Sequence, residues 1–118
     1  MLPKKSRVTA RHDFNKVRKY GRVVATPFFS VAYLPKKVEG SQNRFGFITS
    51  KKLSKRAVIR NRAKRMVREA VRLWLKERFS EDGEFMDVVF IIRRGILDKG
   101  YEEISRLVNQ VLPKIFKP

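Results

Sequence analysis

The sequence of 118 residues contains no cysteine and a single histidine, His12. The absence of cysteine excludes disulfides and thiolate metal sites. No apolar run approaches the roughly 18 residues that cross a bilayer, and the basic N-terminus lacks the apolar segment of a secretory signal. We therefore expect a soluble, cytoplasmic protein with no membrane contact and no obligate protein partner. A lone histidine in a basic context is a poor general base, so we expect no catalytic residue in the protein.

Acidic residues are scarce in the first part of the chain. Residues 1–68 contain 20 Lys or Arg against only Asp13 and Glu39, whereas residues 69–118 contain nine basic and nine acidic residues. The first part therefore carries the whole net charge of +18. Such asymmetry indicates a polyanionic partner and favours nucleic acid over an anionic membrane. The hydrophobic content of 42% is that of a folded chain, which we expect to form a single domain over residues 1–118.

The pattern of apolar residues predicts elements in the order α-β-β-β-α-β-α. The expected helices lie at about residues 9–20, 56–79 and 101–116, and the expected strands lie at 22–26, 28–34, 44–50 and 85–92. This order is typical of an α/β two-layer sandwich. The second helix would join two parallel strands, and such a crossover is right-handed by default.

The expected helix at residues 56–79 has an apolar side and a cationic side when its residues are placed about 100° apart. The apolar stripe consists of Ile59, Ala63, Met66, Val67, Ala70, Leu73 and Trp74. The opposite side carries Asn61, Lys64, Arg65, Arg68, Arg72 and Lys76, and the flanks carry Arg60 and Arg62. A solvated helix normally interleaves acids at i,i+4 to relieve repulsion, and Arg65–Glu69 is almost the only such pair here. The helix therefore indicates docking onto folded RNA through its shape and phosphates.

A second candidate surface involves the expected strand at residues 28–34. Alternation places Phe28, Ser30 and Ala32 together on one side of this strand. With Phe14 and Arg18 of the first helix, this side would form a groove in which the bases of a single strand stack. The alternative is that Phe14 and Phe28 simply belong to the core.

An acidic cluster lies near an expected turn and consists of Glu81, Asp82, Glu84 and Asp87. We interpret it as a solubilising loop that offsets the charge of the basic helix. The alternative is a divalent-cation site in a self-contained metal nuclease, although carboxylates at this irregular spacing specify little. The chain has no phosphate-binding glycine loop and no nucleophile–base pair.

Several motifs closely resemble the bacterial ribonuclease P protein component. The central one comprises Ser50-Lys51-Lys52, Ala57-Val58 and the run Arg60-Asn61-Arg62-Ala63-Lys64-Arg65-Met66-Val67-Arg68-Glu69. Asp13-Phe14 with Gly21, and Asp87-Val88-Val89 followed by Arg93, occupy matching places, so the resemblance spans nearly the whole chain. The chain departs from the family at Arg18, where another aromatic residue is expected, and at Ala32, where one often occurs.

The resemblance implies a left-handed βαβ crossover, against the default above, in a fold like the second domain of ribosomal protein S5. It implies a subunit of ribonuclease P that assists Mg²⁺-dependent endonucleolytic removal of the 5′ leader from precursor tRNA. The catalytic centre and the Mg²⁺ would belong mainly to the RNA subunit, with no metal site in the protein. The alternative is a general ribosomal or structured-RNA-binding protein.

Two sets of residues are expected to carry this function. The RNA-subunit set is Lys51, Lys52, Arg56, Arg60, Asn61, Arg62, Lys64, Arg65, Arg68 and Arg72. The set expected to line the groove for the substrate leader is Phe14, Arg18, Phe28 and Ser30.

Overall fold

The structure, a computed structural model, describes residues 11–36, 43–49, 53–78 and 85–116. Its elements are α1 (Arg11–Tyr20), β1 (Arg22–Ala25), β2 (Phe29–Lys36), β3 (Arg44–Ile48), α2 (Ala57–Arg78), β4 (Phe85–Ile92), the short 3₁₀ helix η2 (Arg94–Asp98) and α3 (Tyr101–Ile115). The predicted order of helices and strands is confirmed, and η2 is an addition to it.

The strands form one mixed sheet in the order β1-β2-β4-β3. β2 pairs antiparallel with β1 and with β4, whereas β3 pairs in parallel with β4. β4 therefore lies between two neighbours, which suits a strand that is apolar at almost every position. The parallel pair β3–β4, joined through α2, is the predicted βαβ unit.

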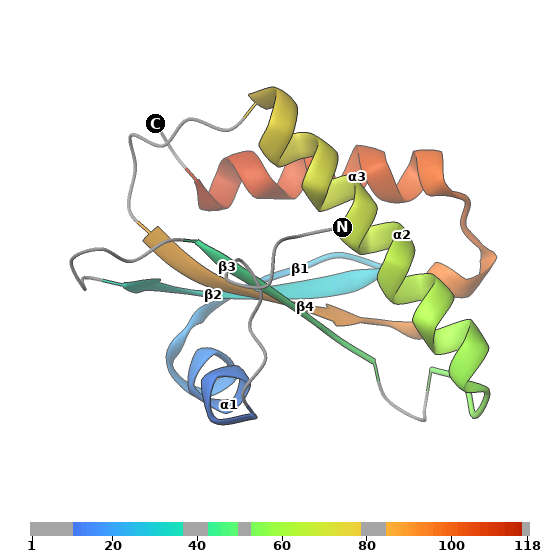
Figure 1. Ribbon diagram of the computed structural model, residues 1–118, viewed down its shortest axis with the longest axis horizontal. Coiled ribbons are helices and arrows are strands. Elements are labelled where there is room, and N and C mark those ends of the chain that lie inside the picture. The colour runs from blue at the N-terminus through green and yellow to red at the C-terminus, as the bar shows by residue number, and fades with distance from the viewer. Residues whose placement is uncertain (1–10, 37–42, 50–52, 79–84, 117–118) are drawn as a thin grey trace.

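Helices cover both faces of the sheet, with α2 and α3 on one face and α1 on the other (Figure 1). The main core lies beneath α2 and α3. At its centre the ring of Phe90 packs against Phe29 and Phe47, with ring centroids 5.3 and 5.4 Å apart. A smaller buried cluster beneath α1 consists of Val17, Ala32 and Val89. The predicted α/β packing of helices on one sheet is confirmed, but the prediction of two layers is incomplete, because α1 on the opposite face adds a third, partial layer (Figure 1).

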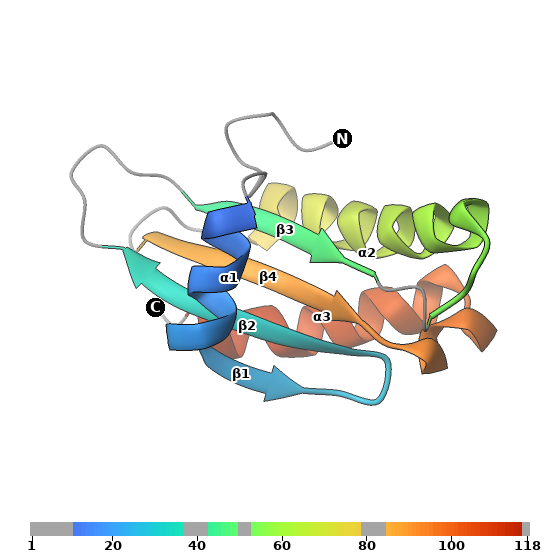
Figure 2. The same cartoon turned by 90° about the horizontal axis from the view of Figure 1, so that it is seen from below.

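The β3–α2–β4 crossover is left-handed. With α1 toward the viewer, β3 and β4 both point to the right, β3 lies above β4, and α2 lies behind the sheet (Figure 2). The right-handed default is therefore wrong here, and the left-handed crossover implied by the resemblance is confirmed. A right-handed crossover would have placed α2 over Ser30, Ala32 and Gly46, which are small. The large rings of Phe47 and Phe90 face α2 and α3 instead, so their burial favours the left-handed path.

Gly21 determines how closely α1 approaches the sheet. Its N–H donates to the carbonyl oxygen of Val17 at 2.8 Å, at the end of the helix. A Cβ atom at this position would lie 2.5 Å from the carbonyl oxygen of Val17 and 2.6 Å from that of Tyr33. Both oxygens belong to the backbone, so no flexible side chain is available to move aside. The missing side chain thus lets the end of α1 press against β2.

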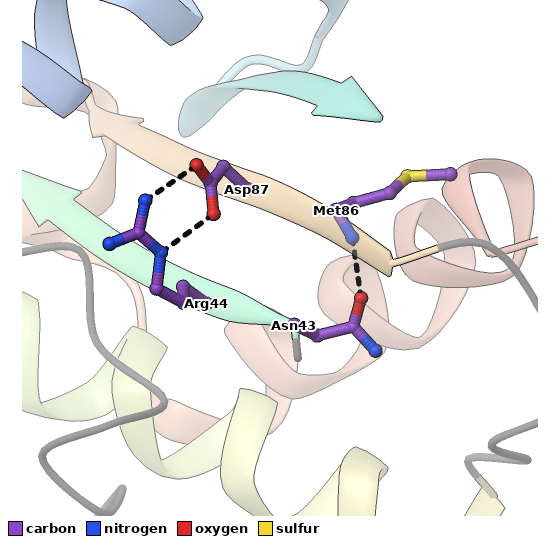
Figure 3. A network of polar contacts seen from close by, with 4 residues as sticks. All are labelled: Asn43, Arg44, Met86 and Asp87. Carbon is purple, nitrogen blue, oxygen red and sulfur yellow. Dashed lines mark hydrogen bonds and ion pairs between the residues drawn. The ribbon is translucent and has the colours of Figure 1, made fainter. Parts of the chain in front are cut away.

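Polar contacts align β3 with β4 where the two strands begin. Arg44 donates from Nε to Oδ1 of Asp87 at 2.9 Å and from Nη2 to Oδ2 at 2.8 Å, and Asn43 Oδ1 accepts from the N–H of Met86 at 2.7 Å (Figure 3). Asp87 is only 6% exposed, and the guanidinium compensates its buried charge. The prediction that Asp87 belongs to an acidic surface cluster is wrong, because Asp87 lies within β4 and pairs with Arg44. The other members of that cluster, Glu81, Asp82 and Glu84, lie outside the described residues.

Candidate nucleic-acid interface

The core side of α2 is rotated slightly from the predicted stripe. Its buried residues are Ala63, Val67, Ala70, Val71 and Trp74. Val71 was not part of the predicted stripe, whereas Leu73 was part of it and is only half-buried. The helical period gives the mean direction of the apolar side chains, but the positions of the strands decide which of them are covered.

The side of α2 that points away from the core is exposed and cationic. We call Asn61, Arg62, Lys64 and Arg65 the cationic face; Lys64 is half-buried and the other three are exposed. Within the part of the chain that the structure describes, no ion pair or side-chain hydrogen bond engages Arg62, Lys64 or Arg65. The first turn of α2 also contains no acidic residue to offset the positive end of the helix dipole. This uncompensated potential suits a row of phosphates.

Arg68 lies differently from the prediction, which placed it on the side opposite the core. It is half-buried, and its guanidinium carbon lies 5.5 Å from the centroid of the Phe47 ring. Its Nε is buried and has no hydrogen-bond partner among the described residues. The cation–π contact holds Arg68 at the junction of α2 and β3, with its charge uncompensated by a carboxylate.

Arg72, whose role in RNA binding stays a prediction, is compensated by an acid. Its Nη2 lies 2.6 Å from Oε1 of Glu69, and its Nε lies 3.1 Å from both carboxylate oxygens. These hydrogen bonds lower the pKa of the Glu69 carboxyl, so the pair stays ionised at neutral pH. Glu69 therefore pairs with Arg72. The i,i+4 pair of Glu69 with Arg65, which the sequence suggested, is not formed. The cationic face ends before Glu69, which limits the candidate interface to the N-terminal half of α2.

The remaining predicted residues of this set lie at or before the start of α2. Arg56 is exposed, and its backbone N–H donates to Oγ of Ser54 at 3.2 Å. Arg60 is half-buried, and its Nη1 donates to the carbonyl oxygens of Ser54 and Lys55 at 2.8 and 3.1 Å. The predicted residues Lys51 and Lys52 lie outside the described residues.

Three of the four residues predicted to line a groove lie on α1 or on the sheet face that α1 covers, and their role in binding a leader stays a prediction. Phe14 is half-buried against the small cluster beneath α1, and Arg18 is exposed on the same helix. Ser30 faces α1's side of the sheet and is 3% exposed. Half-buried Ile48 and Ile91 also pack against the small cluster, so the sheet face beside α1 is apolar.

Phe28 lies elsewhere, and its assignment to the groove is wrong. It precedes β2 in a turn in which Thr26 Oγ1 accepts from the N–H groups of Phe28 and Phe29 at 3.3 and 3.1 Å. The alternation of strand side chains therefore does not extend to it. Phe28 packs against the main core, and Nζ of Lys99 lies 5.3 Å from the centroid of its ring. The alternative that Phe28 is a core residue is the one that the structure supports.

Arg93 lies on the same sheet face as Ser30 and was not among the predicted site residues. It is exposed, and its Nε and Nη2 donate to Oγ of Ser30 at 3.0 and 2.6 Å. The alternation of β4 could have found it, because Arg93 follows Val89 and Ile91 at two-residue spacing and both face α1. Ser30 thus holds the guanidinium of Arg93 on this sheet face, just past the end of β4.

Two further features concern metal binding and contact with a membrane. Residues 11–36, 43–49, 53–78 and 85–116 contain no group of three or more His, Asp or Glu side chains placed to hold a metal ion. None of the helices in these ranges is long and apolar enough to span a bilayer.

Comparison with known proteins gives consistent matches over most of the chain. A family model for ribonuclease P matches residues 2–115. The ribonuclease P protein component of Symbiobacterium thermophilum is 37% identical over 114 residues, covering 96% of this chain and 93% of the relative. A solved structure of the Staphylococcus aureus RNase P protein is similar with a TM-score of 0.78 and 29% identity, covering 93% of this chain and 94% of that one. The RNase P protein of Thermotoga maritima has a TM-score of 0.76, covers 92% of this chain and 96% of its own, and at 23% identity supports the fold alone.

Proposed function

The chain belongs to the ribonuclease P protein family, the protein component of a ribonuclease, and from this membership we propose that it binds the catalytic RNA subunit and the 5′ leader of precursor tRNA. It would thereby assist the Mg²⁺-dependent endonucleolytic cut that removes the leader and leaves the mature 5′ end. We place the protein in the cytoplasm, and we keep as a prediction its likeness to the second domain of ribosomal protein S5.

The observation that carries the proposal is the cationic face of α2. Arg62 and Arg65 are exposed and unpaired within the described residues, and the core residues Ala63 and Val67 hold the helix from behind. Because the helix backbone is held by the core, the guanidinium groups start from fixed positions along α2, and binding phosphates costs only the freedom of their side chains. Such an array supports a folded RNA as the partner of this side of the molecule.

The Mg²⁺ requirement is assigned to the RNA subunit in this proposal. The described residues do not fit a metal site of their own, since they contain no suitable cluster and Asp87 is held by Arg44. Mg²⁺ bound to the RNA would activate the attacking water and stabilise the leaving oxygen. The contribution of the protein is then electrostatic: Arg62 and Arg65 lower the repulsion between two polyanions as substrate and RNA subunit come together.

The experiment is to cleave a precursor tRNA with a ribonuclease P RNA at low Mg²⁺, with and without this protein. We expect the protein to increase the rate of release of the 5′ leader, because it reduces the need for Mg²⁺ as a counterion. An unchanged rate would reject the proposal. The protein alone serves as the control, and leader release without any RNA subunit would instead support the self-contained metal nuclease.

We further propose that the groove between α1 and the sheet binds the leader. Phe14 on α1 and Ile48 and Ile91 on the sheet pack against the small cluster, and such side chains offer stacking and hydrophobic contact to unpaired bases. Arg18 on α1 and Arg93 beyond β4 add positive charge for the backbone of that strand. The sheet separates this groove from α2, so substrate and RNA subunit would use different faces of the protein (Figure 1).

Replacing Arg93 by alanine should weaken the binding of a precursor tRNA to the holoenzyme by about tenfold at roughly 0.1 M salt, the contribution of one phosphate contact. Ser30→Ala should cause a smaller loss, because it removes only the hydroxyl that orients the guanidinium. In the Arg93→Ala background, Ser30→Ala should have no further effect on affinity, since the two residues act as one unit.

The measurement is the dissociation constant of precursor tRNA relative to that of mature tRNA, which lacks the leader. The mature tRNA is the control, and its affinity should not change in any of the three variants. A loss of equal size for both RNAs would mean that Arg93 does not contact the leader.

A further inference from the structure

Arg60 faces the core side of α2, unlike the two residues that follow it in the Arg60-Asn61-Arg62 run. At about 100° per residue, Arg60 points roughly 20° away from Val67, which is fully buried. By the same measure Arg62 points roughly 140° away from Val67, on the exposed side. Arg60 is half-buried, whereas Asn61 and Arg62 are exposed. The first arginine of the run is therefore directed differently from its neighbours.

The guanidinium of Arg60 is engaged by the backbone that precedes the helix. Nη1 donates both of its protons, one to the carbonyl oxygen of Ser54 at 2.8 Å and one to that of Lys55 at 3.1 Å. These carbonyl groups lie before the first residue of α2, Ala57, so the guanidinium supplies them with donors. Arg60 thus ties the connection between β3 and α2 to the first turn of the helix.

The same connection is held at two further points. The side chain of Leu53 is 3% exposed and belongs to the main core. Oγ of Ser54 accepts from the N–H of Arg56 at 3.2 Å. These contacts hold the backbone of residues 53–56 in one conformation. The exposed side chains of Lys55 and Arg56 therefore start from fixed positions.

We propose that Arg60 is a positioning residue for RNA binding and not itself a phosphate contact. Resting on the proposed function, this inference assigns Arg60 the task of orienting the basic connection, including Lys55 and Arg56, against the RNA subunit. Fixing the backbone before binding reduces the conformational entropy that is lost on binding. Contact with phosphates is left to the cationic face, of which Arg65 is the most outward-pointing member.

Salt dependence separates the two roles. A residue that contacts a phosphate releases a counterion, and its removal reduces the slope of log K against log salt concentration by about 0.9. A residue that only orients the backbone changes affinity by the same factor at every salt concentration. For Arg60→Ala we expect about a fivefold loss of affinity for the RNA subunit, the size of one hydrogen bond's net contribution, with an unchanged slope.

Arg60→Gln tests the geometry without the charge. The glutamine amide can donate two hydrogen bonds from one nitrogen, as Nη1 of arginine does here, and it is uncharged. The glutamine side chain is two bonds shorter than that of arginine, so we expect Arg60→Gln to recover part of the affinity lost in Arg60→Ala. Thermal unfolding of both variants supplies the folded fraction, so a change in stability is not mistaken for a change in affinity.

The dissociation constant is measured for the full chain and a bacterial ribonuclease P RNA over a series of salt concentrations, with Arg65→Ala as the matched control. A slope for Arg60→Ala that falls as far as that of Arg65→Ala, with no recovery in Arg60→Gln, would overturn the inference and make Arg60 a phosphate contact. Unchanged affinity in Arg60→Ala would overturn it as well. If Arg65→Ala alters neither affinity nor slope, the proposed RNA-binding function fails and the inference fails with it.

Discussion

Replacing both Arg62 and Arg65 by alanine is expected to weaken binding to the ribonuclease P RNA subunit about 100-fold at roughly 0.1 M salt. Each phosphate contact contributes close to a factor of ten at that salt concentration through counterion release, and both side chains are exposed and free of acids within the described residues. The slope of log K against log salt should fall by about 1.8. Filter binding or fluorescence anisotropy over a salt series measures both quantities.

The matched control removes the same charge elsewhere. Arg106→Ala combined with Lys114→Ala also lowers the net charge by two, and both of these side chains are exposed on α3. This pair should change the affinity by less than about threefold, since general charge effects are largely screened at roughly 0.1 M salt. An equal loss in the two double variants would show that net charge, and not the cationic face, determines binding.

Gly21→Ala should destabilise the protein by about 3 kcal/mol, at the upper end of what overpacking costs. The added Cβ would lie 2.5 and 2.6 Å from two backbone oxygens, so α1 must move away from β2. For a domain of this size the melting temperature should fall by roughly 10 °C. Because the displaced helix carries Phe14 and Arg18, discrimination between precursor and mature tRNA should fall as well.

Gly100→Ala is the control for Gly21→Ala. A Cβ at Gly100 meets no atom within 4 Å, so this substitution adds a methyl group in open space at the start of α3. Thermal unfolding should show a loss of less than about 1 kcal/mol, which is the usual range for an N-cap change to alanine. If the melting temperatures of Gly21→Ala and Gly100→Ala differ by less than about 2 °C, α1 accommodates the added methyl group without loss of stability.

The order of elements could be predicted from sequence because each one carries its own local pattern. β4 is an unbroken apolar run, and α3 repeats its apolar residues with the helical period. The hand of the crossover could not be predicted this way. It depends on which face of the finished sheet has room for α2, and that is decided by side chains from three different strands. Only the family resemblance supplied the correct hand.

The candidate site was predictable in outline but not in the pairing of individual charges. The helical period correctly placed Asn61 and Arg65 on the outside of α2, whereas Arg62, predicted on a flank, is exposed there as well. It could not foresee that Glu69 selects Arg72 at i+3, because Arg65 at i−4 was an equally good candidate. Arg68 illustrates a different limit: its contact with Phe47 crosses from α2 to β3.

The groove residues show how a boundary error moves a side chain to the wrong face. The predicted strand began at Phe28, whereas β2 begins at Phe29 after the turn at Thr26. Within the strand the alternation is correct, and Ser30 lies on the expected face. Arg93 was missed for the mirror-image reason, because the alternation of β4 continues one residue past the end of the strand.

The position of β4 between β2 and β3 has a consequence for assembly. The same strand presents Phe90 to the side of α2 and Val89 to the side of α1, so the sheet is the common layer beneath both surfaces. Substitutions on opposite sides of the sheet share no side chain, so their effects on stability should add. A ligand on the α2 side and a ligand on the α1 side would therefore not compete for the same atoms of the protein.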